Sequence, residues 1–525
     1  MFHFCYIFYG FIVFGCKITN FLIITAEYLY QISIEMLQYE DFYFLYYHIY
    51  YIARIVNYCY SLCFCVQNSC YSLMKCVNLQ RYSLMKCVKR VNIMYRTAIQ
   101  RLIAWKNSHR RKPLIIEGAR QVGKTWLVKE FAKLHYKSIA YINFEENTYL
   151  RNIFEIDYDI DRITAAISAA THTNCAADGT LIFLDEIQEA KNGITALKYF
   201  QENAPHLHII VAGSLLGIQL HRQVSFPVGK VQFMTLYPMN FCEFLLAMGE
   251  DALAKMIDVG DWTNINMFAP KFRELLKYYY YVGGMPEAVL CFSQNRDWTE
   301  VRNIQLDILK SYERDFSKHA PEDIAPRIHD LWLSLPSQLG KENRKFVYGL
   351  VKQGARAREY EIALQWLIDG GLIHRVNCVK APRMPLKSYE DRNAFKIYCV
   401  DIGLLGAMCR MDSATLIDGS QIFTEFKGAL TEQYVMQQLT GGLELFYFSK
   451  PNSSQEIDFL IQSGMDILPI EVKAEVSVKA KSLKQFVIEN SPRHAYRLSM
   501  NDYKQEEWMT NIPLYAVEHL MTLIV

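Results

Sequence analysis

The chain lacks an excess of charge of either sign. Its 525 residues carry 56 lysines and arginines against 54 aspartates and glutamates, a formal net charge of +2 at pH 7. A protein that attracts a polyanion through its overall field needs a much larger positive charge. Any contact with nucleic acid therefore has to come from a local patch. The length predicts about three domains, at roughly 150 residues each.

Paired cysteines are absent beyond the first ninety residues. Eight of the 14 cysteines lie in that segment, and the other six are Cys175, Cys242, Cys291, Cys378, Cys399 and Cys409. These six have neither C-x-x-C spacing nor histidine partners at the spacing of a zinc site. They are typical of small apolar residues in a reducing compartment, so we expect no disulfide, no structural zinc and a cytoplasmic location.

The first 93 residues lack proline and hold a single aspartate, Asp41. They are rich in Tyr, Phe, Ile and Cys, and YSLMKCV occurs at 71–77 and again at 82–88. Three interpretations stay open. The segment is a membrane anchor whose apolar run Lys17 interrupts, or a real soluble domain, or upstream DNA translated from a start placed before the true initiator Met94. We favour the last, and expect no membrane contact unless these residues are real. No basic region precedes the apolar run, which argues against a secretory signal.

Residues 94–300 show the pattern of a nucleotide-binding domain. The apolar run Leu114–Ile116 leads into GARQVGKT and then into an amphipathic helix, which is the strand, loop and helix order of a phosphate-binding loop. Backbone N–H groups of such a loop bind phosphates, Lys124 neutralises β- and γ-phosphate charge, and Thr125 offers its hydroxyl to Mg²⁺. The predicted ATP-binding residues are Gly118, Ala119, Arg120, Gln121, Val122, Gly123, Lys124 and Thr125.

Two further strands of this domain end in polar residues. Leu181–Leu184 is a continuous apolar run followed by Asp185 and Glu186. Asp185 is predicted to hold Mg²⁺ together with Thr125, and Glu186 to polarise the water that attacks the γ-phosphate. HIIVAGSLLG predicts a buried strand that ends at Ser214. The hydroxyl of Ser214 either senses the γ-phosphate or caps the following turn.

The motifs GARQVGKT, LIFLDEIQ, VAGSLLG, FPVGKVQFMTLYPMNFCEFL and YYVGGMPEAV resemble those of bacterial and archaeal AAA-type ATPases that carry a winged-helix segment and a nuclease-like C-terminal domain. The resemblance runs from Met94 to the C-terminus. It implies a trans-acting arginine finger near Lys230, but this chain has lysine there, which puts the finger in doubt. The turn Gly283–Pro286 resembles a motif in the lid of signalling-type nucleotidases.

Residues 301–405 have the pattern of short helices followed by a hairpin. KFVYGLVKQGARAREYEIALQWLIDGGLIHRV predicts a helix-turn-helix that ends at Gly370 before a strand, as in a winged helix. The basic residues of this segment that could meet a phosphate backbone are Arg356, Arg358, Arg375, Lys380, Arg383 and Lys387. Such modules either place a helix in the major groove of DNA or serve only as packing modules. The sequence is compatible with both roles for this segment.

Residues 406–525 are predicted to form an α/β nuclease-like domain. The order helix, strand, strand, strand, helix is that of restriction-endonuclease-like folds. Metal-dependent cleavage needs carboxylates on Mg²⁺ and a lysine near the attacking water. The predicted catalytic residues are Glu432, Asp458, Glu471 and Lys473, of which Asp458 and Glu471 are the predicted metal ligands. The alternative is a solvated or ion-paired set of charges that has no activity.

The sequence thus predicts an α/β protein with a P-loop AAA-type parallel-sheet domain, a helical or winged-helix middle and an α/β nuclease-like C-terminal domain. One function is Mg²⁺-dependent ATP hydrolysis coupled to a DNA-directed nuclease-like domain. The other is an ATP-controlled assembly switch whose C-terminal domain only binds partners. ATP is the predicted small-molecule partner, and DNA and further copies of the chain are the macromolecular partners considered.

Overall fold

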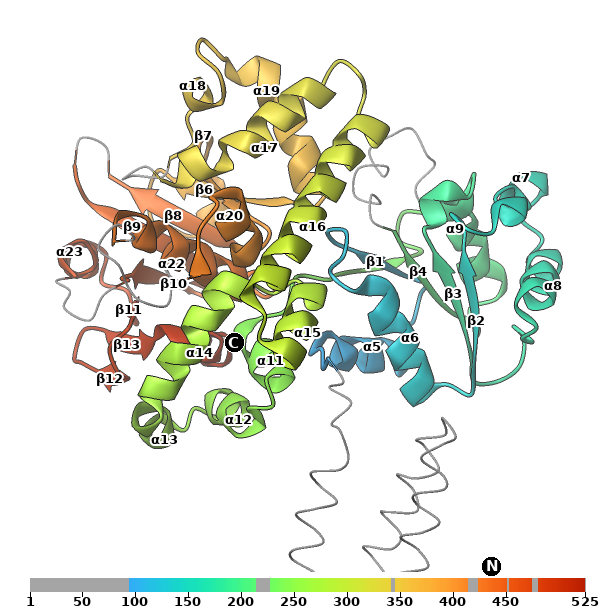
Figure 1. The fold of residues 1–525 in the computed structure, drawn as a ribbon, viewed down its shortest axis with the longest axis horizontal. Helices are drawn as coiled ribbons and strands as arrows, with labels where there is room; N and C mark the ends of the chain where they lie inside the picture. Colours follow the sequence, from blue (N-terminus) through green and yellow to red (C-terminus); the bar gives the residue numbers. More distant parts are fainter. Residues whose placement is uncertain are drawn as a thin grey trace, which may run out of the picture. The chain divides into compact units, whose positions relative to one another are not determined.

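The computed structural model describes residues 94–213, 227–340, 345–413, 424–450, 453–474 and 480–524 (Figure 1). The chain divides into the units Met1–Val91 and Asn92–Val525, and the described residues all belong to the second. The interpretations of residues 1–93 and the role of Ser214 lie outside these ranges. No helix within them has the length and apolar character that crossing a bilayer requires.

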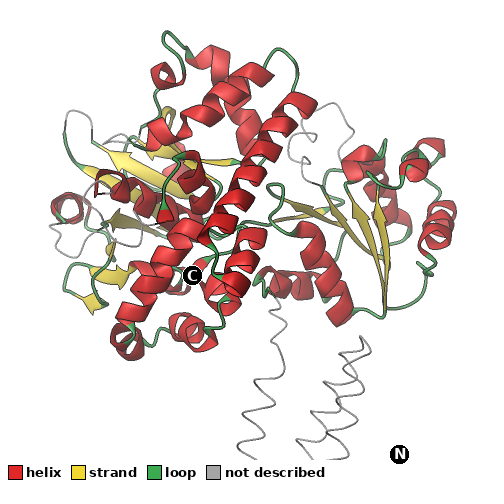
Figure 2. Cartoon of the chain, viewed as in Figure 1, coloured by secondary structure: helices red, strands yellow, loops and turns green. Residues whose placement is uncertain are grey.

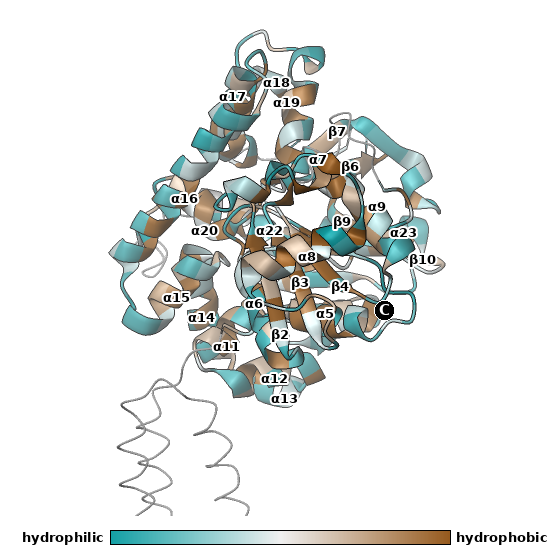
Figure 3. Ribbon diagram, turned by 90° about the vertical axis from the view of Figure 1, so that its right-hand side faces the viewer, coloured by the Kyte–Doolittle hydropathy of each residue, from teal (hydrophilic) through white to brown (hydrophobic). Residues whose placement is uncertain are grey.

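Five parallel strands form the first sheet, in the order β2-β3-β4-β1-β5. The strands are β1 (Leu114–Glu117), β2 (Ser138–Asn143), β3 (Thr180–Asp185), β4 (His208–Ala212) and β5 (Gln232–Thr235). Every residue of β3 is buried, as expected for a strand with both faces covered. Figure 3 shows the mainly hydrophobic colouring of β3 and β4. The buried acidic strand predicted from the sequence is therefore central.

Helices pack on both faces of this sheet. They are α5 (Ala98–Lys106), α6 (Lys124–His135), α7 (Ile153–Ile156), α8 (Ile160–Thr171) and α9 (Gly193–Asn203). Leu181 and Phe183 of β3 share a hydrophobic core with Phe131 of α6, whereas Ile182 and Leu184 share another with α8 and α9. Successive side chains of a strand point to opposite faces, so one apolar run supplies two cores.

The middle of the unit is helical, as Figure 2 shows. Its helices are α11 (Phe241–Ala247), α12 (Asp251–Val259), α13 (Trp262–Met267), α14 (Ala269–Val282), α15 (Pro286–Asn295), α16 (Trp298–His319), α17 (Ala325–Leu339), α18 (Tyr348–Val351) and α19 (Ala357–Asp369). α16 is the longest of these. Its N-cap is Asp297, whose carboxylate accepts hydrogen bonds from the N–H groups of Thr299 and Glu300, which is the usual way to satisfy the first donors of a helix.

An eight-stranded sheet follows, in the order β12-β13-β11-β10-β9-β8-β6-β7. Its strands are β6 (Ile373–Val379), β7 (Glu390–Cys399), β8 (Leu445–Ser449), β9 (Glu456–Ser463), β10 (Asp466–Val472), β11 (Tyr496–Ser499), β12 (Lys504–Gln505) and β13 (Thr510–Pro513), and the helices of this region are α20 (Ile402–Met408), α22 (Thr424–Leu439), α23 (Lys481–Asn490) and α24 (His519–Ile524). The predicted order helix, three strands, helix is present as α22, β8, β9, β10 and α23.

The hairpin of β6 and β7 differs from the sequence expectation. It was expected as the wing of the 301–405 segment, but β6 pairs in parallel with β8, so the hairpin belongs to the C-terminal sheet. A free wing would leave one edge of β6 without backbone partners, and β8 supplies them. The C-terminal sheet therefore extends across the boundary expected at residue 405.

Candidate functional site

The phosphate-binding loop runs from the end of β1 to the start of α6. Gly118 has a φ of +135°, and a Cβ atom there would lie 2.2 Å from the carbonyl oxygen of Leu236. Gly123 has a φ of +90° and directly precedes α6. Both positions therefore require glycine. The side chain of Lys124 folds back over the loop, and its Nζ donates to the carbonyl oxygens of Gly118 at 2.9 Å and Ala119 at 2.8 Å.

The acidic end of β3 meets this loop. Thr125 Oγ1 donates to Asp185 Oδ2 at 2.7 Å, and the Tyr141 hydroxyl approaches the same oxygen at 3.3 Å. Burial raises the pKa of Asp185, and the hydrogen bond from Thr125 opposes that rise. The backbone N–H of Glu186 donates to Asp185 Oδ1 at 3.2 Å. The structure thus brings together Lys124, Thr125, Asp185 and Glu186, which lie some sixty residues apart in sequence.

Burial also perturbs the loop lysine. The pKa of Lys124 is lowered to about 8, because desolvation of the ammonium outweighs the attraction of Glu186 and Asp185. Groups whose pKa is shifted by burial and by specific charged neighbours are candidates for a functional site. The arginine finger that the resemblance implied falls at Lys230, and Lys230 Nζ instead lies 2.9 Å from Glu202 Oε1.

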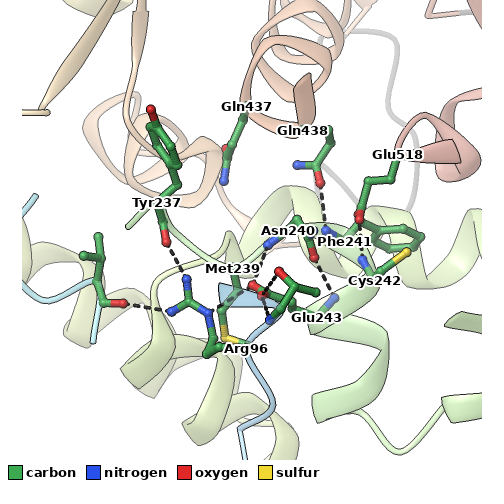
Figure 4. Close-up of polar contacts among 12 residues, drawn as sticks. Arg96, Tyr237, Met239, Asn240, Phe241, Cys242, Glu243, Gln437, Gln438 and Glu518 are labelled. Carbon is green, nitrogen blue, oxygen red and sulfur yellow. Dashed lines mark hydrogen bonds and ion pairs between the residues drawn. The ribbon is translucent and has the colours of Figure 1, made fainter. Parts of the chain in front are cut away.

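A buried arginine ties the loop to the helices that follow the sheet. Arg96 Nη1 donates to the Val122 carbonyl at 2.9 Å, Nη2 to the Tyr237 carbonyl at 2.5 Å, and Nε to Glu243 at 3.1 Å (Figure 4). The partners lie 26, 141 and 147 residues away in the chain. Sequence reasoning missed this residue, since a single arginine before a helix carries no motif.

The first turn of α11 is capped by the C-terminal region. Figure 4 shows Gln438 and Glu518 directed at its first backbone N–H groups: the N–H of Phe241 donates to Gln438 at 2.7 Å and that of Cys242 to Glu518 at 2.7 Å. The backbone N–H of Glu243 donates to Asn240 Oδ1 at 2.8 Å. Helix N-termini leave such donors unsatisfied, so α11 is capped both by its own Asn240 and by residues 197 and 276 positions away.

The Gly283–Gly284 turn lies beside the same junction. Gly284 N–H donates to Asp401 Oδ2 at 2.6 Å, and a Cβ on Gly284 would lie 2.1 Å from the Met239 carbonyl oxygen. Asp401 is fully buried and also accepts from Leu404 N–H and from Gln437 Nε2, both at 3.0 Å. The paired glycines in the sequence signalled this close approach, but they did not identify Asp401.

Three of the four residues predicted for the nuclease-like site lie together. Val472 N–H donates to Asp458 Oδ2 at 2.7 Å, and Lys473 Nζ lies 2.8 Å from Glu471 Oε1. Burial raises the pKa of Glu471, the charge of Lys473 opposes this, and the charge of Asp458 adds to it. The strands β9 and β10 are antiparallel neighbours, which explains how two acids thirteen residues apart become close.

Glu432 has other partners. Its Oε1 accepts from Lys396 Nζ at 3.0 Å and from the Tyr398 hydroxyl, and Lys396 also reaches Glu456 at 2.6 Å. Lys396 is wholly buried. In the described ranges, no three acidic, histidine or cysteine side chains converge as a metal site would require. Glu432 is thus ion-paired with Lys396, and its membership of the group of Asp458, Glu471 and Lys473 stays a prediction. The sequence signal that could have indicated this ion pair is the lysine within the apolar run AFKIYC, since a buried lysine needs an acidic partner.

Comparisons with known proteins assign part of the chain. A family model described as an AAA domain matches residues 110–245. Two further models, both described as domains of unknown function, match residues 273–415 and 427–517. The chain matches none of the curated proteins with which it was compared.

Solved structures show more distant likeness. The Walker-type ATPase PABY2304 of Pyrococcus abyssi is 14% identical over 61% of this chain and 97% of its own, with a TM-score of 0.39. The Aeropyrum pernix ORC1 protein in complex with DNA is 11% identical over 62% and 95%, with a TM-score of 0.25. The Thermotoga maritima RuvB Holliday junction branch migration motor is 14% identical over 56% and 90%, with a TM-score of 0.24. At TM-scores this low, none of these structures indicates a function for the chain.

The family match and the parallel sheet agree on the nucleotide-binding part. The match covers β1, the phosphate loop, the acidic end of β3 and β5. Residues 110–245 form an AAA-type P-loop ATPase domain, joined to a helical middle region and a C-terminal α/β sheet.

Proposed function

We propose that the chain binds ATP with Mg²⁺ at the phosphate loop and hydrolyses it. The observation that carries this proposal is the 2.7 Å hydrogen bond between Thr125 and Asp185 at the end of the parallel sheet. A hydroxyl and a carboxylate are the oxygen donors that Mg²⁺ takes beside nucleotide phosphates. Thr125 and Asp185 would hold the ion, which would neutralise charge on the β- and γ-phosphates.

The other residues have distinct roles in this proposal. Lys124 exchanges the carbonyls of Gly118 and Ala119 for phosphate oxygens, and the N–H groups at the start of α6 add to the binding. Glu186 follows Asp185 at the same sheet edge and orients the attacking water, from which it takes a proton.

Lys124→Ala should abolish binding of a fluorescent ATP analogue. Binding that persists unchanged would contradict the assignment of the loop.

We further propose that the C-terminal domain is a nuclease-like module that acts on DNA. Support comes from the core order α22, β8, β9, β10, α23 and β11, with β10 parallel to β11, and from the proximity of Asp458, Glu471 and Lys473. In this role Asp458 and Glu471 bind the metal and Lys473 orients water at the scissile phosphate.

A specific observation favours the second candidate, a switch whose C-terminal domain only binds partners. Lys473 is paired with Glu471, and Glu432 is held by Lys396. Ion pairs of this kind also occur in inactive folds. In this reading, ATP controls assembly of several copies, so the mass of the particle measured by light scattering would change on addition of ATP.

Plasmid cleavage separates the two candidates. The wild type is incubated with plasmid and Mg²⁺ or Mn²⁺, with and without ATP, beside the double variant Glu471→Ala/Lys473→Ala. The matched control is Lys450→Ala/Glu489→Ala, which removes an exposed ion pair of the same domain. Cleavage lost only in the first variant supports the nuclease. Intact ATP hydrolysis without cleavage by the wild type supports the switch.

A further inference from the structure

The C-terminal third of α16 lies against the phosphate loop through one face. Tyr312, Asp315 and Lys318 are spaced by three residues, so their side chains lie on neighbouring positions of the helix surface. The Tyr312 hydroxyl donates to the Arg120 carbonyl at 2.8 Å, and Arg120 Nη1 lies 2.5 Å from Asp315 Oδ1. Lys318 Nζ is 4.0 Å from Glu145, which follows β2. Helix α16 is therefore bonded to the phosphate-binding loop at Arg120, the third residue of GARQVGKT.

The guanidinium of Arg120 is ion-paired with the carboxylate of Asp315. Burial alone would lower its pKa, but the hydrogen bond and charge of Asp315 raise it, with smaller contributions from Glu186 and Glu145. The side chain of Asp315 is only 9% exposed, while that of Arg120 is 35% exposed. The guanidinium of Arg120 in the phosphate-binding loop is thus paired with a carboxylate of helix α16.

We propose that Arg120 is a nucleotide-phosphate ligand that Asp315 holds while the loop is empty, so that α16 and the nucleotide compete for one guanidinium. This inference rests on the proposed ATP binding. A guanidinium binds carboxylate and phosphate through the same fork of N–H donors. Arg120 belongs to the phosphate-binding loop, and its side chain is 35% exposed, so its guanidinium is accessible to a phosphate bound at that loop.

The competition links nucleotide state to the helical region. When a triphosphate takes Arg120, Asp315 loses its partner and α16 is released from the loop; by reciprocity, anything that holds α16 in place weakens nucleotide binding. The neighbouring Phe316 packs against Trp332 and Trp366, with ring centroids 5.8 Å and 5.5 Å apart. Movement of α16 on nucleotide binding therefore changes the surroundings of two tryptophans.

The test measures dissociation constants of fluorescent ATP and ADP analogues for the full chain with Mg²⁺. Asp315→Asn removes the competing charge and should tighten ATP binding by about three- to tenfold, or up to ~1.4 kcal/mol. Arg120→Gln should weaken ATP binding by a similar factor and ADP binding by less. The control is Asp307→Asn, the same change on the exposed side of the same helix, where Asp307 pairs with Lys310; it should leave both constants unchanged.

The double variant Arg120→Gln/Asp315→Asn provides the decisive comparison. If Asp315 acts by holding Arg120, removal of Asp315 brings no gain once Arg120 is gone. A gain that survives in the double variant, or no gain in Asp315→Asn, overturns the proposal. Should Asp315→Asn fail to fold, Tyr312→Phe removes only the hydrogen bond to the Arg120 carbonyl and should tighten ATP binding by about twofold; an unchanged constant then overturns it. A wild type that binds no nucleotide refutes the proposed function instead.

Discussion

Asp401 is predicted to be a main determinant of stability at the junction between the Gly283–Gly284 turn and α22. Its carboxylate accepts three hydrogen bonds inside the protein, from Gly284, Leu404 and Gln437. In Asp401→Ala these three buried donors lose their acceptor, and each such loss costs about 1–3 kcal/mol. Burial of the carboxylate itself is unfavourable and raises its pKa, so part of this cost is offset. We expect a net loss of about 4 kcal/mol in the free energy of unfolding.

The assay is urea denaturation of the full chain, followed by tryptophan fluorescence. Asp401→Asn keeps one acceptor oxygen and should lose about 2 kcal/mol. Asp412→Asn is the control, since Asp412 is exposed and its substitution should change stability by less than about 0.5 kcal/mol. A loss below about 1 kcal/mol for Asp401→Ala would show that the cost of burying the charge cancels its hydrogen bonds, and would refute the reasoning.

Three further outcomes are expected. Gly118→Ala should abolish ATP-analogue binding because its Cβ would lie 2.2 Å from the Leu236 carbonyl oxygen, whereas Gly464→Ala, with open space at the same atom, should bind normally; equal binding by both would contradict this. Lys124 has a pKa of about 8, and since only the protonated amine attracts phosphate, ATP affinity should fall as pH rises through about 8. A titration from pH 7 to 9.5 that stays flat speaks against a role for this amine. Burial raises the pKa of Glu518 to about 7 from 4.5, so its contribution to stability is present below pH 4.5 and is lost as pH rises through 7. Glu518→Gln should flatten the stability profile in that window, and an unchanged slope would exclude Glu518 as the cause.

Local patterns predicted the strand, loop and helix around GARQVGKT and the acidic end of β3. GARQVGKT and the run ending at Asp185 each contain strand, turn and charge within a few residues. Parallel strands bring their carboxyl ends to one edge, so the contact between Thr125 and Asp185 followed from the sequence. The helix and strand order of the C-terminal domain was predictable for the same reason, since each element has its own periodicity.

Contacts between distant elements were not predictable. Arg96, Asp401 and Lys396 are single polar residues whose partners lie far away in the chain, and no spacing rule connects them. The place of the β6–β7 hairpin depended on which strand edge was available to it, which a local pattern does not encode. The ion pair of Glu432 with the buried Lys396 is a further contact of this kind.

Steady-state release of phosphate from ATP in the presence of Mg²⁺ measures the proposed hydrolysis itself, with wild type, Lys124→Ala and Glu186→Gln compared side by side. We predict turnover by the wild type, no nucleotide binding by Lys124→Ala, and a Glu186→Gln variant that binds ATP as tightly as the wild type but hydrolyses it at least about a hundredfold more slowly. Wild-type turnover that survives unchanged in Glu186→Gln would contradict the assigned role of Glu186, and the absence of ATP binding by the wild type would contradict the account as a whole.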